Sequence, residues 1–180
     1  MRCTVLAAPF AILLIASGCK GAPPSSAPTQ AIASCAGAPD IALQGRVTDA
    51  ADILPDAAEG RLSDRLAQYE GRTGHQMVVV TASSLNGLDV AAVGDCLGNR
   101  WGIGDKDRND GVLILVAPNE RRARISTGTG LETMLTDEEA KAAIDLMTPH
   151  FRSNDFAGGL SVAVDAIAAQ TGDSRCSRLC

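Results

Sequence analysis

Four oxygen-bearing side chains stand just before an aliphatic run in the segment WGIGDKDRNDGVLILV, residues 101–116. They are Asp105, Asp107, Asn109 and Asp110. Carboxylate and amide oxygens are the ligands that Ca²⁺ and Mg²⁺ prefer, so the segment is a candidate site for a hard divalent cation. Asp and Asn side chains also bond their own backbone in turns, and the spacing alone does not choose between a cation site and a turn.

The spacing differs from that of an EF-hand calcium loop. The pattern D-x-D-x-N fits the first five positions, but Asp110 stands where the loop needs glycine, and Val116 stands where it needs glutamate. The segment is therefore not an EF-hand, and any cation site there needs ligands from elsewhere in the fold.

Strand patterns indicate where such ligands lie. HQMVVVTA at 75–82 and GVLILVA at 111–117 predict buried strands that are parallel because a helix separates them, and RARISTG at 122–128 predicts an antiparallel partner. The acidic segment then enters one strand at the end of the sheet where the segment TGTGLE, 127–132, leaves its antiparallel partner. We therefore expect Glu132 beside the acidic segment.

The same turn carries Gly128 and Gly130, which have no side chain to hold two backbones apart. We expect these glycines to let the turn approach the acidic loop closely. They are also candidates for close backbone approach to a cofactor, although TGTG lacks the lysine of a nucleotide-phosphate loop.

Helical patterns predict layers on both faces of the sheet. The predicted helices are marked by the apolar stripe in 54–73, by Val90, Val93, Leu97 and Trp101, by the Thr136 and Glu139 capping box, and by Leu160, Val164 and Ile167. The pattern predicts the α/β class: a three-layer α/β/α sandwich with a small mixed β-sheet, in one domain at residues 46–171.

The N-terminus resembles an export signal followed by a lipobox. Arg2 precedes an apolar run too short to span a bilayer, and IASGC places small residues before Cys19. We expect a signal peptide at 1–18, acylation of Cys19 and a flexible tether at 19–45. A plain cleavable signal with an incidental cysteine is the alternative. Lys20 favours outer-membrane attachment facing the periplasm.

The partners implied are the lipid membrane, through Cys19, and an envelope protein complex. The net charge is −5 and no basic stripe is visible, so nucleic acid is not expected as a partner.

The remaining cysteines indicate disulfides, as in other exported proteins. Cys35, Cys96, Cys176 and Cys180 allow three pairings, and the sequence does not choose among them. Our expectation is that Cys35 bonds Cys176 or Cys180, in the C-terminal tail at 172–180, and that Cys96 takes the other. His75 and His150 have no visible partner in the sequence, so structural roles are expected for both.

Five segments share their order and spacing with one family. They are VTDAADIL at 47–54, TGHQMVVVT at 73–81, RWGIGDKDRNDGVLILVAP at 100–118, ISTGTGLE at 125–132 and HFRSNDFAGGL at 150–160. Together they resemble the TPM domain family. The resemblance implies an α/β/α sandwich and an exported or membrane-tethered protein. Relatives include acid phosphatases on model substrates, divalent-cation binders and a thylakoid-lumen protein linked to photosystem II repair.

The resemblance also implies a set of site residues, carried over by position. The glycine-rich turn falls on Gly128 and Gly130, and Arg152 and Asp155 match an F-R-x-x-D stretch. Asp52 stands where relatives often have glycine, while Ala50 and Thr129 stand where an aromatic is usual. The implied metal ligands are Asp49, Asp105, Asp107, Asn109, Asp110 and Glu132.

Two functions follow as hypotheses. The first is a divalent-cation-binding module, holding Ca²⁺ or Mg²⁺, that is tethered to the membrane and helps to assemble or repair an envelope complex. The alternative is a metal-assisted acid phosphatase that hydrolyses phosphomonoesters, with Asp107 or Asp110 as nucleophile or base. A purely structural interaction domain predicts neither metal binding nor turnover.

Overall fold

The computed structural model describes residues 35–173. Cys19, for which acylation was expected, lies outside these residues, as do most of the expected tether and the tail cysteines Cys176 and Cys180. No helix in the described range is long and apolar enough to cross a membrane.

A four-stranded mixed sheet forms the middle layer, in the order β1-β2-β3-β4. Its strands are β1 (Val47–Asp49), β2 (Gln76–Thr81), β3 (Gly111–Ala117) and β4 (Arg122–Thr127). The first three strands run parallel and β4 runs antiparallel to β3, which confirms the predicted pairing. The sequence patterns did not predict β1 as a strand.

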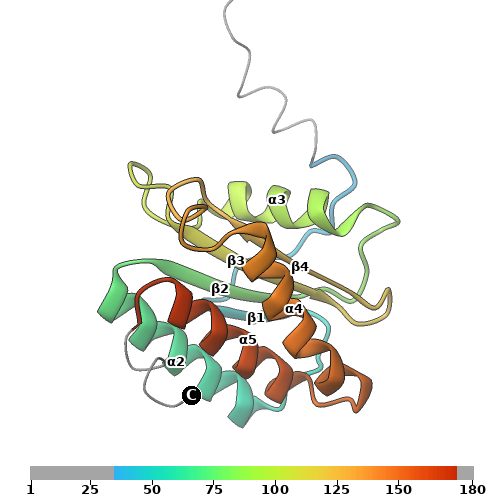
Figure 1. The fold of residues 1–180 in the computed structure, drawn as a ribbon. Coiled ribbons are helices and arrows are strands. Elements are labelled where there is room, and N and C mark those ends of the chain that lie inside the picture. Colours follow the sequence, from blue (N-terminus) through green and yellow to red (C-terminus); the bar gives the residue numbers. More distant parts are fainter. Residues whose placement is uncertain (1–34, 174–180) are drawn as a thin grey trace, which may run out of the picture.

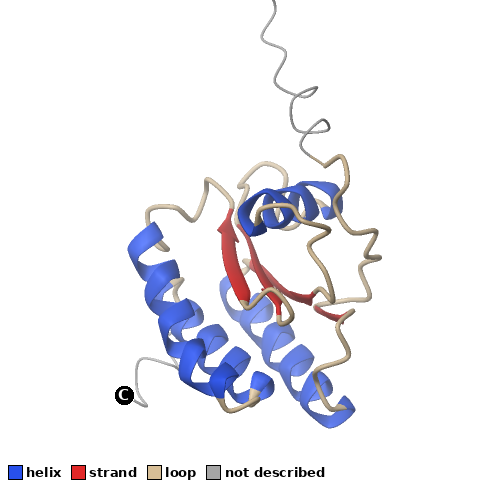
Figure 2. Ribbon diagram, turned by 90° about the vertical axis from the view of Figure 1, so that its right-hand side faces the viewer, coloured by secondary structure: helices blue, strands red, loops and turns tan. Residues whose placement is uncertain are grey.

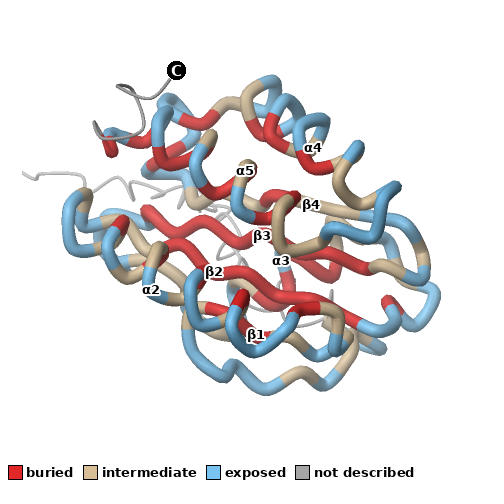
Figure 3. Tube along the Cα trace, turned by 90° about the horizontal axis from the view of Figure 1, so that it is seen from below, coloured by how far each residue is buried: buried red, intermediate tan, exposed pale blue. Residues whose placement is uncertain are grey.

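Helices cover both faces of this sheet (Figures 1 and 2). On one face lie α2 (Asp56–Thr73), α4 (Asp137–Arg152) and α5 (Phe156–Gln170), and on the other lies α3 (Val90–Trp101). Alternate β3 side chains enter two separate cores, so that Ile114 packs with the three-helix layer and Leu113 packs with α3. The buried strands lie between exposed helix surfaces in Figure 3. The α/β/α sandwich is confirmed.

Two helix boundaries lie where the sequence predicted them. Gly74 ends α2 in the left-handed conformation, with φ of 77°, and its N–H donates to the Glu70 carbonyl. Thr136 and Glu139 form the capping box that begins α4. These local signals fix where the chain leaves each helix.

The connections between the parallel strands leave the sheet in opposite directions. The strands β1, β2 and β3 follow one another across the sheet, yet α2 and α3 pack on opposite faces. The two crossovers therefore have opposite hands, whereas such connections are almost always right-handed. Chains that diverge from neighbouring carboxyl ends open a crevice there, and open α/β sheets bind ligands in such crevices.

The disulfide expectation for Cys35 was wrong. Cys35 bonds Cys96, with a Cα–Cα distance of 5.2 Å, and not Cys176 or Cys180. The reason is the path of the chain. The segment after Cys35 runs beside α3, where Arg100 lies 3.8 Å from Asp40, whereas Asp173 is bound to Arg65 and Arg72 of α2, on the other face of the sheet.

Candidate functional site

The acidic loop and the glycine-rich turn meet at the amino end of β3, as the sequence predicted. The Gly128 N–H donates to the Gly111 carbonyl at 2.8 Å, and the Gly130 N–H donates to the Asn109 carbonyl at 2.9 Å. The Asn109 side-chain amide also donates to the Thr129 hydroxyl at 2.9 Å. The two segments therefore form one joined loop pair, residues 105–110 and 128–132.

Glycine is required where these loops touch. A Cβ atom on Gly128 would lie 2.2 Å from the Asn109 carbonyl oxygen, and one on Gly130 would lie 1.9 Å from the Arg108 carbonyl oxygen. Both distances are far below van der Waals contact. Gly128 and Gly130 were candidates for close approach to a cofactor. The packing of the loop pair is enough to explain why both positions are glycine.

Asp105 organises the acidic loop as a turn. Its Oδ1 accepts hydrogen bonds from the Asp107 and Arg108 N–H groups, both at 3.0 Å. The Asn109 N–H donates to the Asp105 carbonyl at 2.7 Å, and Asn109 itself has a φ of 48°. Asn tolerates this left-handed conformation better than most residues. Part of the acidic cluster thus has the turn chemistry that was the alternative to a cation site.

Asp110 is a buried carboxylate, only 2% exposed. Its Oδ1 accepts the Asp105 N–H at 2.9 Å, and its Oδ2 accepts Arg108 Nε at 2.7 Å and lies 2.9 Å from His75 Nδ1. Burial alone would raise the pKa of Asp110, but the hydrogen bonds from Arg108, the Asp105 amide and His75 outweigh it and hold the pKa well below its ordinary value. A substrate would have to displace these partners before the Asp110 carboxylate could react with it.

Sequence reasoning missed the pairing of His75 with Asp110. Each residue directly precedes a strand, and the first residues of those strands, Gln76 and Gly111, are register partners in the parallel pair. The predicted parallel pairing would have placed His75 beside Asp110 if the register of the two strands had been known. His75 is a positioning partner for the buried carboxylate.

Besides Asp105, whose carboxylate is also exposed but accepts hydrogen bonds within the loop, two exposed acids lie at this end, Asp107 and Glu132. Within residues 35–173 no hydrogen bond or ion pair engages either side chain. In the same range, no three His, Cys, Asp or Glu side chains converge in the way that a site built from such groups would require. A cation bound here would draw on two carboxylates, the Asn109 side-chain oxygen, main-chain carbonyls and water.

The structure does not bring Asp49 to the loop pair. Asp49 ends β1 beside Thr81 at the carboxyl end of the parallel strands, whereas the acidic loop lies at their amino end. The Asp49 Oδ2 accepts N–H groups of Ile53 at 2.9 Å and Leu54 at 2.7 Å, and the Thr81 hydroxyl donates to its Oδ1. Asp49 therefore fixes the loop between β1 and α2.

The position of Asp52 in that loop also has a physical explanation. Asp52 has a φ of 53°, in the left-handed region that favours glycine. This conformation accounts for the glycine that relatives often carry at the same position.

Arg152 and Asp155 have separate roles at the end of α4. Asp155 caps α5 by accepting the Gly158 N–H at 2.9 Å, and it lies 2.8 Å from His150 Nδ1. The hydrogen bond from His150, followed by that from Gly158, lowers the pKa of Asp155. Arg152 lines a cavity at the carboxyl end of β3 instead.

Comparison with known proteins decides the family. The sequence pattern of the TPM domain matches residues 47–170, well over half of the chain. The chain belongs to the TPM domain family. No protein with a curated description matches it.

Solved structures of similar domains include those of three bacterial proteins. The TPM domain described here is 34% identical to the N-terminal domain of a P. gingivalis protein, with a TM-score of 0.65 and coverage of 71% of this chain and 82% of that chain. The N-terminal domain of cg2496 from Corynebacterium glutamicum is 20% identical, with a TM-score of 0.59 and coverage of 76% and 86%. The BA42 protein from Bizionia argentinensis is 18% identical, with a TM-score of 0.59 and coverage of 67% and 82%. The last two similarities establish the fold alone.

The close approach at Gly130 predicts a large effect of a small substitution. Gly130→Ala should lower the free energy of unfolding by about 2–4 kcal/mol, because the new methyl group collides with the Arg108 carbonyl. Gly60→Ala in α2 is the matched control, since its Cβ meets nothing within 4 Å, and it should stabilise the TPM domain by roughly 0.5–1 kcal/mol. Urea denaturation measures both, and equal stabilities of the two variants would contradict the loop packing.

Asp110 predicts a pH dependence of stability in the acid range. Its pKa in the folded chain lies below the ordinary value of 3.8, so the unfolded chain takes up a proton first as the pH falls. The stabilisation is therefore complete above about pH 5 and is lost as the pH falls from about 4 through the folded-state pKa. Asp110→Asn should be less stable by about 2 kcal/mol at neutral pH and should show a flatter dependence below pH 5, in urea denaturation at a series of pH values.

Arg108→Gln serves as a second variant for this prediction. It removes the donor that most lowers the pKa of Asp110 while keeping the carboxylate, so it should also flatten the acid dependence. If stability falls with pH in both variants as steeply as in the wild type, Asp110 is not the cause of the acid dependence of stability.

Proposed function

We propose that this chain is an envelope-tethered TPM domain that binds a divalent cation at the loop pair and acts as an accessory factor in assembly or repair. The observation that carries the cation proposal is the joined loop pair, which holds exposed oxygen ligands from two segments on one rigid support. A support of this kind lowers the entropy lost when ligands close around an ion.

The ligands we propose are Asp107, Glu132 and the Oδ1 atom of Asn109. The Asn109 amide nitrogen donates to Thr129, which orients the side chain and leaves Oδ1 as an acceptor. We leave Asp105, Asp110 and Asp49 out of the proposed ligand set. Asp105 and Asp110 are engaged by hydrogen bonds within the loop, and Asp49 lies at the other end of the sheet.

This ligand set favours Ca²⁺ over Mg²⁺ and implies weak binding. Ca²⁺ accepts six to eight oxygens in a flexible geometry, including carbonyls and water, whereas Mg²⁺ demands a near-ideal octahedron. With two carboxylates, the expected dissociation constant is that of extracellular modules, about 10⁻⁴ to 10⁻³ M. Such an affinity suits a compartment where free Ca²⁺ is high, in keeping with an exported protein.

Membrane attachment through Cys19 is the second part of the proposal. It is supported by the resemblance of IASGC to a lipobox and by the Pro- and Ser-rich segment that follows. At Cys35 the chain becomes covalently fastened to α3 through Cys96. A lipid on Cys19 would thus hold the domain at the membrane through a chain of about 15 residues.

The cation proposal predicts the outcome of a calorimetric titration of the full chain with Ca²⁺ and Mg²⁺. Asp107→Asn and Glu132→Gln should each weaken Ca²⁺ binding about tenfold or more, because each removes one of two carboxylates. Asp64→Asn, an exposed acid on α2, is the matched control and should bind like the wild type. Absence of heat at millimolar Ca²⁺, or equal binding by all variants, would refute the site.

The Asp107→Asn variant also tests the alternative function, which is phosphomonoester hydrolysis. Of the two acids proposed for it, only Asp107 is exposed, so Asp107→Asn alone should abolish phosphate release from phenyl phosphate. Phosphate release that persists in folded Asp107→Asn would rule out Asp107 as the catalytic group.

The tether proposal predicts the mass of the mature N-terminus. In bacterial membranes the chain should begin at Cys19 and carry the mass of a diacylglycerol, and Cys19→Ala should lack that lipid mass. A mature chain that begins elsewhere without lipid would show that the N-terminus is a plain cleavable signal.

A further inference from the structure

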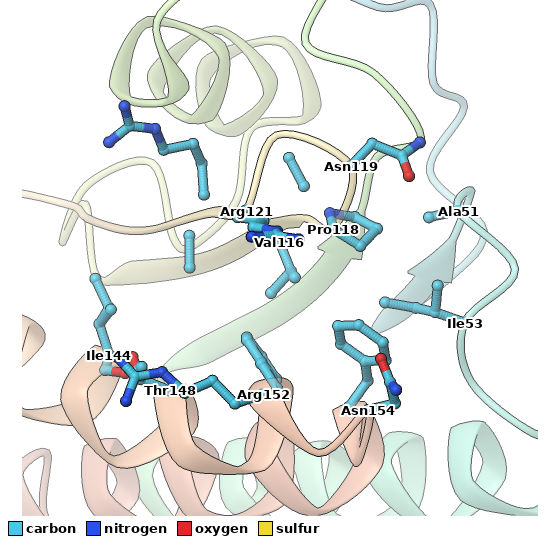
Figure 4. A pocket seen from close by; sticks show the side chains of 15 residues that line it. Ala51, Ile53, Val116, Pro118, Asn119, Arg121, Ile144, Thr148, Arg152 and Asn154 are labelled. Carbon is cyan, nitrogen blue, oxygen red and sulfur yellow. The ribbon is translucent and has the colours of Figure 1, made fainter.

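A cavity of about 880 Å³ lies at the carboxyl end of β3, opposite the acidic loop (Figure 4). Its walls come from the β1–α2 loop, the turn between β3 and β4, and the C-terminal end of α4 with the turn that follows. This is the end of the sheet where neighbouring chains diverge to opposite faces. Its size and place are those of small-molecule sites in open α/β sheets.

Apolar side chains make up much of the cavity surface. Ile53 and Val116 line it from the sheet side, and Phe151 and Phe156 line it from the helical side. The two phenyl rings pack together with their centroids 5.2 Å apart. This surface would accept an apolar group of a ligand, with the two phenyl rings, tilted by 39° to each other, as part of the wall.

The charged groups around the cavity are all basic. Arg121, Arg122 and Arg152 line it, and no Asp or Glu does. Within residues 35–173 none of these three arginines forms an ion pair, whereas Arg46, Arg65, Arg72, Arg100 and Arg108 each face a carboxylate. In a chain with a net charge of −5, unpaired arginines collected at one cavity are unexpected.

Two of these arginines come from different walls of the cavity. Arg121 lies at the β3–β4 turn and Arg152 lies across the cavity on α4 (Figure 4). Arg122 is less well placed, because its strand neighbour Ala123 packs with the three-helix core, and alternation along β4 directs Arg122 to the other face. Guanidinium groups bind carboxylates and phosphates through paired hydrogen bonds.

The surrounding polar groups suit the same ligand. Asn119, Thr148 and Asn154 also line the cavity and offer amide or hydroxyl donors. Asp49 does not enter it, but holds in place the loop that supplies Ala51 and Ile53 to its wall. The acid that the family pattern grouped with the metal ligands thus positions this cavity.

We propose that this cavity binds a small organic anion, a carboxylate or phosphate monoester attached to an apolar group. Arg121 and Arg152 hold the anionic group from opposite sides, and the apolar group packs between Val116 and the phenyl rings. The site is separate from the proposed cation site, and it does not depend on that site being correct.

Calorimetry of the full chain, in a chelator to remove divalent cations, tests the proposal with four probes. Benzoate and phenyl phosphate should bind with millimolar or lower dissociation constants. Benzyl alcohol, which lacks the charge, and inorganic phosphate, which lacks the apolar group, should each bind at least about tenfold more weakly.

Variants then assign the contacts. Arg121→Gln and Arg152→Gln should each weaken binding of both anions about tenfold, and Arg61→Gln, which removes an exposed charge on α2, should have no effect. Because the chelator removes divalent cations, binding measured in it is separate from the fate of the cation proposal. Circular dichroism confirms that each variant is folded.

Three outcomes would overturn the proposal. The first is no binding of either anion at millimolar concentration. The second is equal binding by the wild type and the folded variants Arg121→Gln and Arg152→Gln. The third is equal affinity for benzyl alcohol or inorganic phosphate, which would leave either the arginines or the apolar wall without a role.

Discussion

The burial of β3 on both faces is the constraint on which the rest of the fold depends. All seven of its residues, from Gly111 to Ala117, are buried. Val112, Ile114 and Val116 face the three-helix layer, while Leu113 and Leu115 face α3. A strand with two apolar faces is stable only between two covering layers, so its polar neighbours are placed at its ends. The acidic loop therefore lies at one end of β3, and the arginine-lined cavity lies at the other.

Each end of the sheet is held by a carboxylate that works as a hydrogen-bond acceptor. At the amino end, Asp110 gathers donors from Arg108, His75 and the Asp105 backbone. At the carboxyl end, Asp49 gathers the Thr81 hydroxyl and two backbone N–H groups. The acids in the family pattern are therefore of two kinds. Some build the loops, whereas Asp107 and Glu132 are exposed and, within residues 35–173, engaged by no hydrogen bond.

Local and periodic features of the fold could be predicted from the sequence, and contacts that depend on register or chain path could not. The helix ends at Gly74 and Thr136 follow from neighbouring residues, and the meeting of the loops at Asn109 and Gly130 follows from strand directions alone. By contrast, the three residues of β1 are too few to show an alternation.

Each contact that the sequence did not predict depends on strand register or on the path of the chain, and neither can be read from neighbouring residues. The pairing of His75 with Asp110 depends on the exact register of β2 and β3. The Cys35–Cys96 disulfide depends on which face of the sheet the N-terminal segment follows. The cavity was not foreseen because Arg121 and Arg152 belong to separate elements, and nothing local marks them as neighbours.

The distance between the two ends determines how they can influence each other. Seven residues of β3 span about 20 Å, well beyond the Debye length of about 8 Å at physiological ionic strength. A cation at the loop pair would therefore change the affinity of the arginine-lined cavity very little through charge alone. Communication between the ends would need a mechanical change, and β3 is too tightly packed on both faces to shift in small steps. The two proposed sites should consequently behave as independent features of one rigid layer.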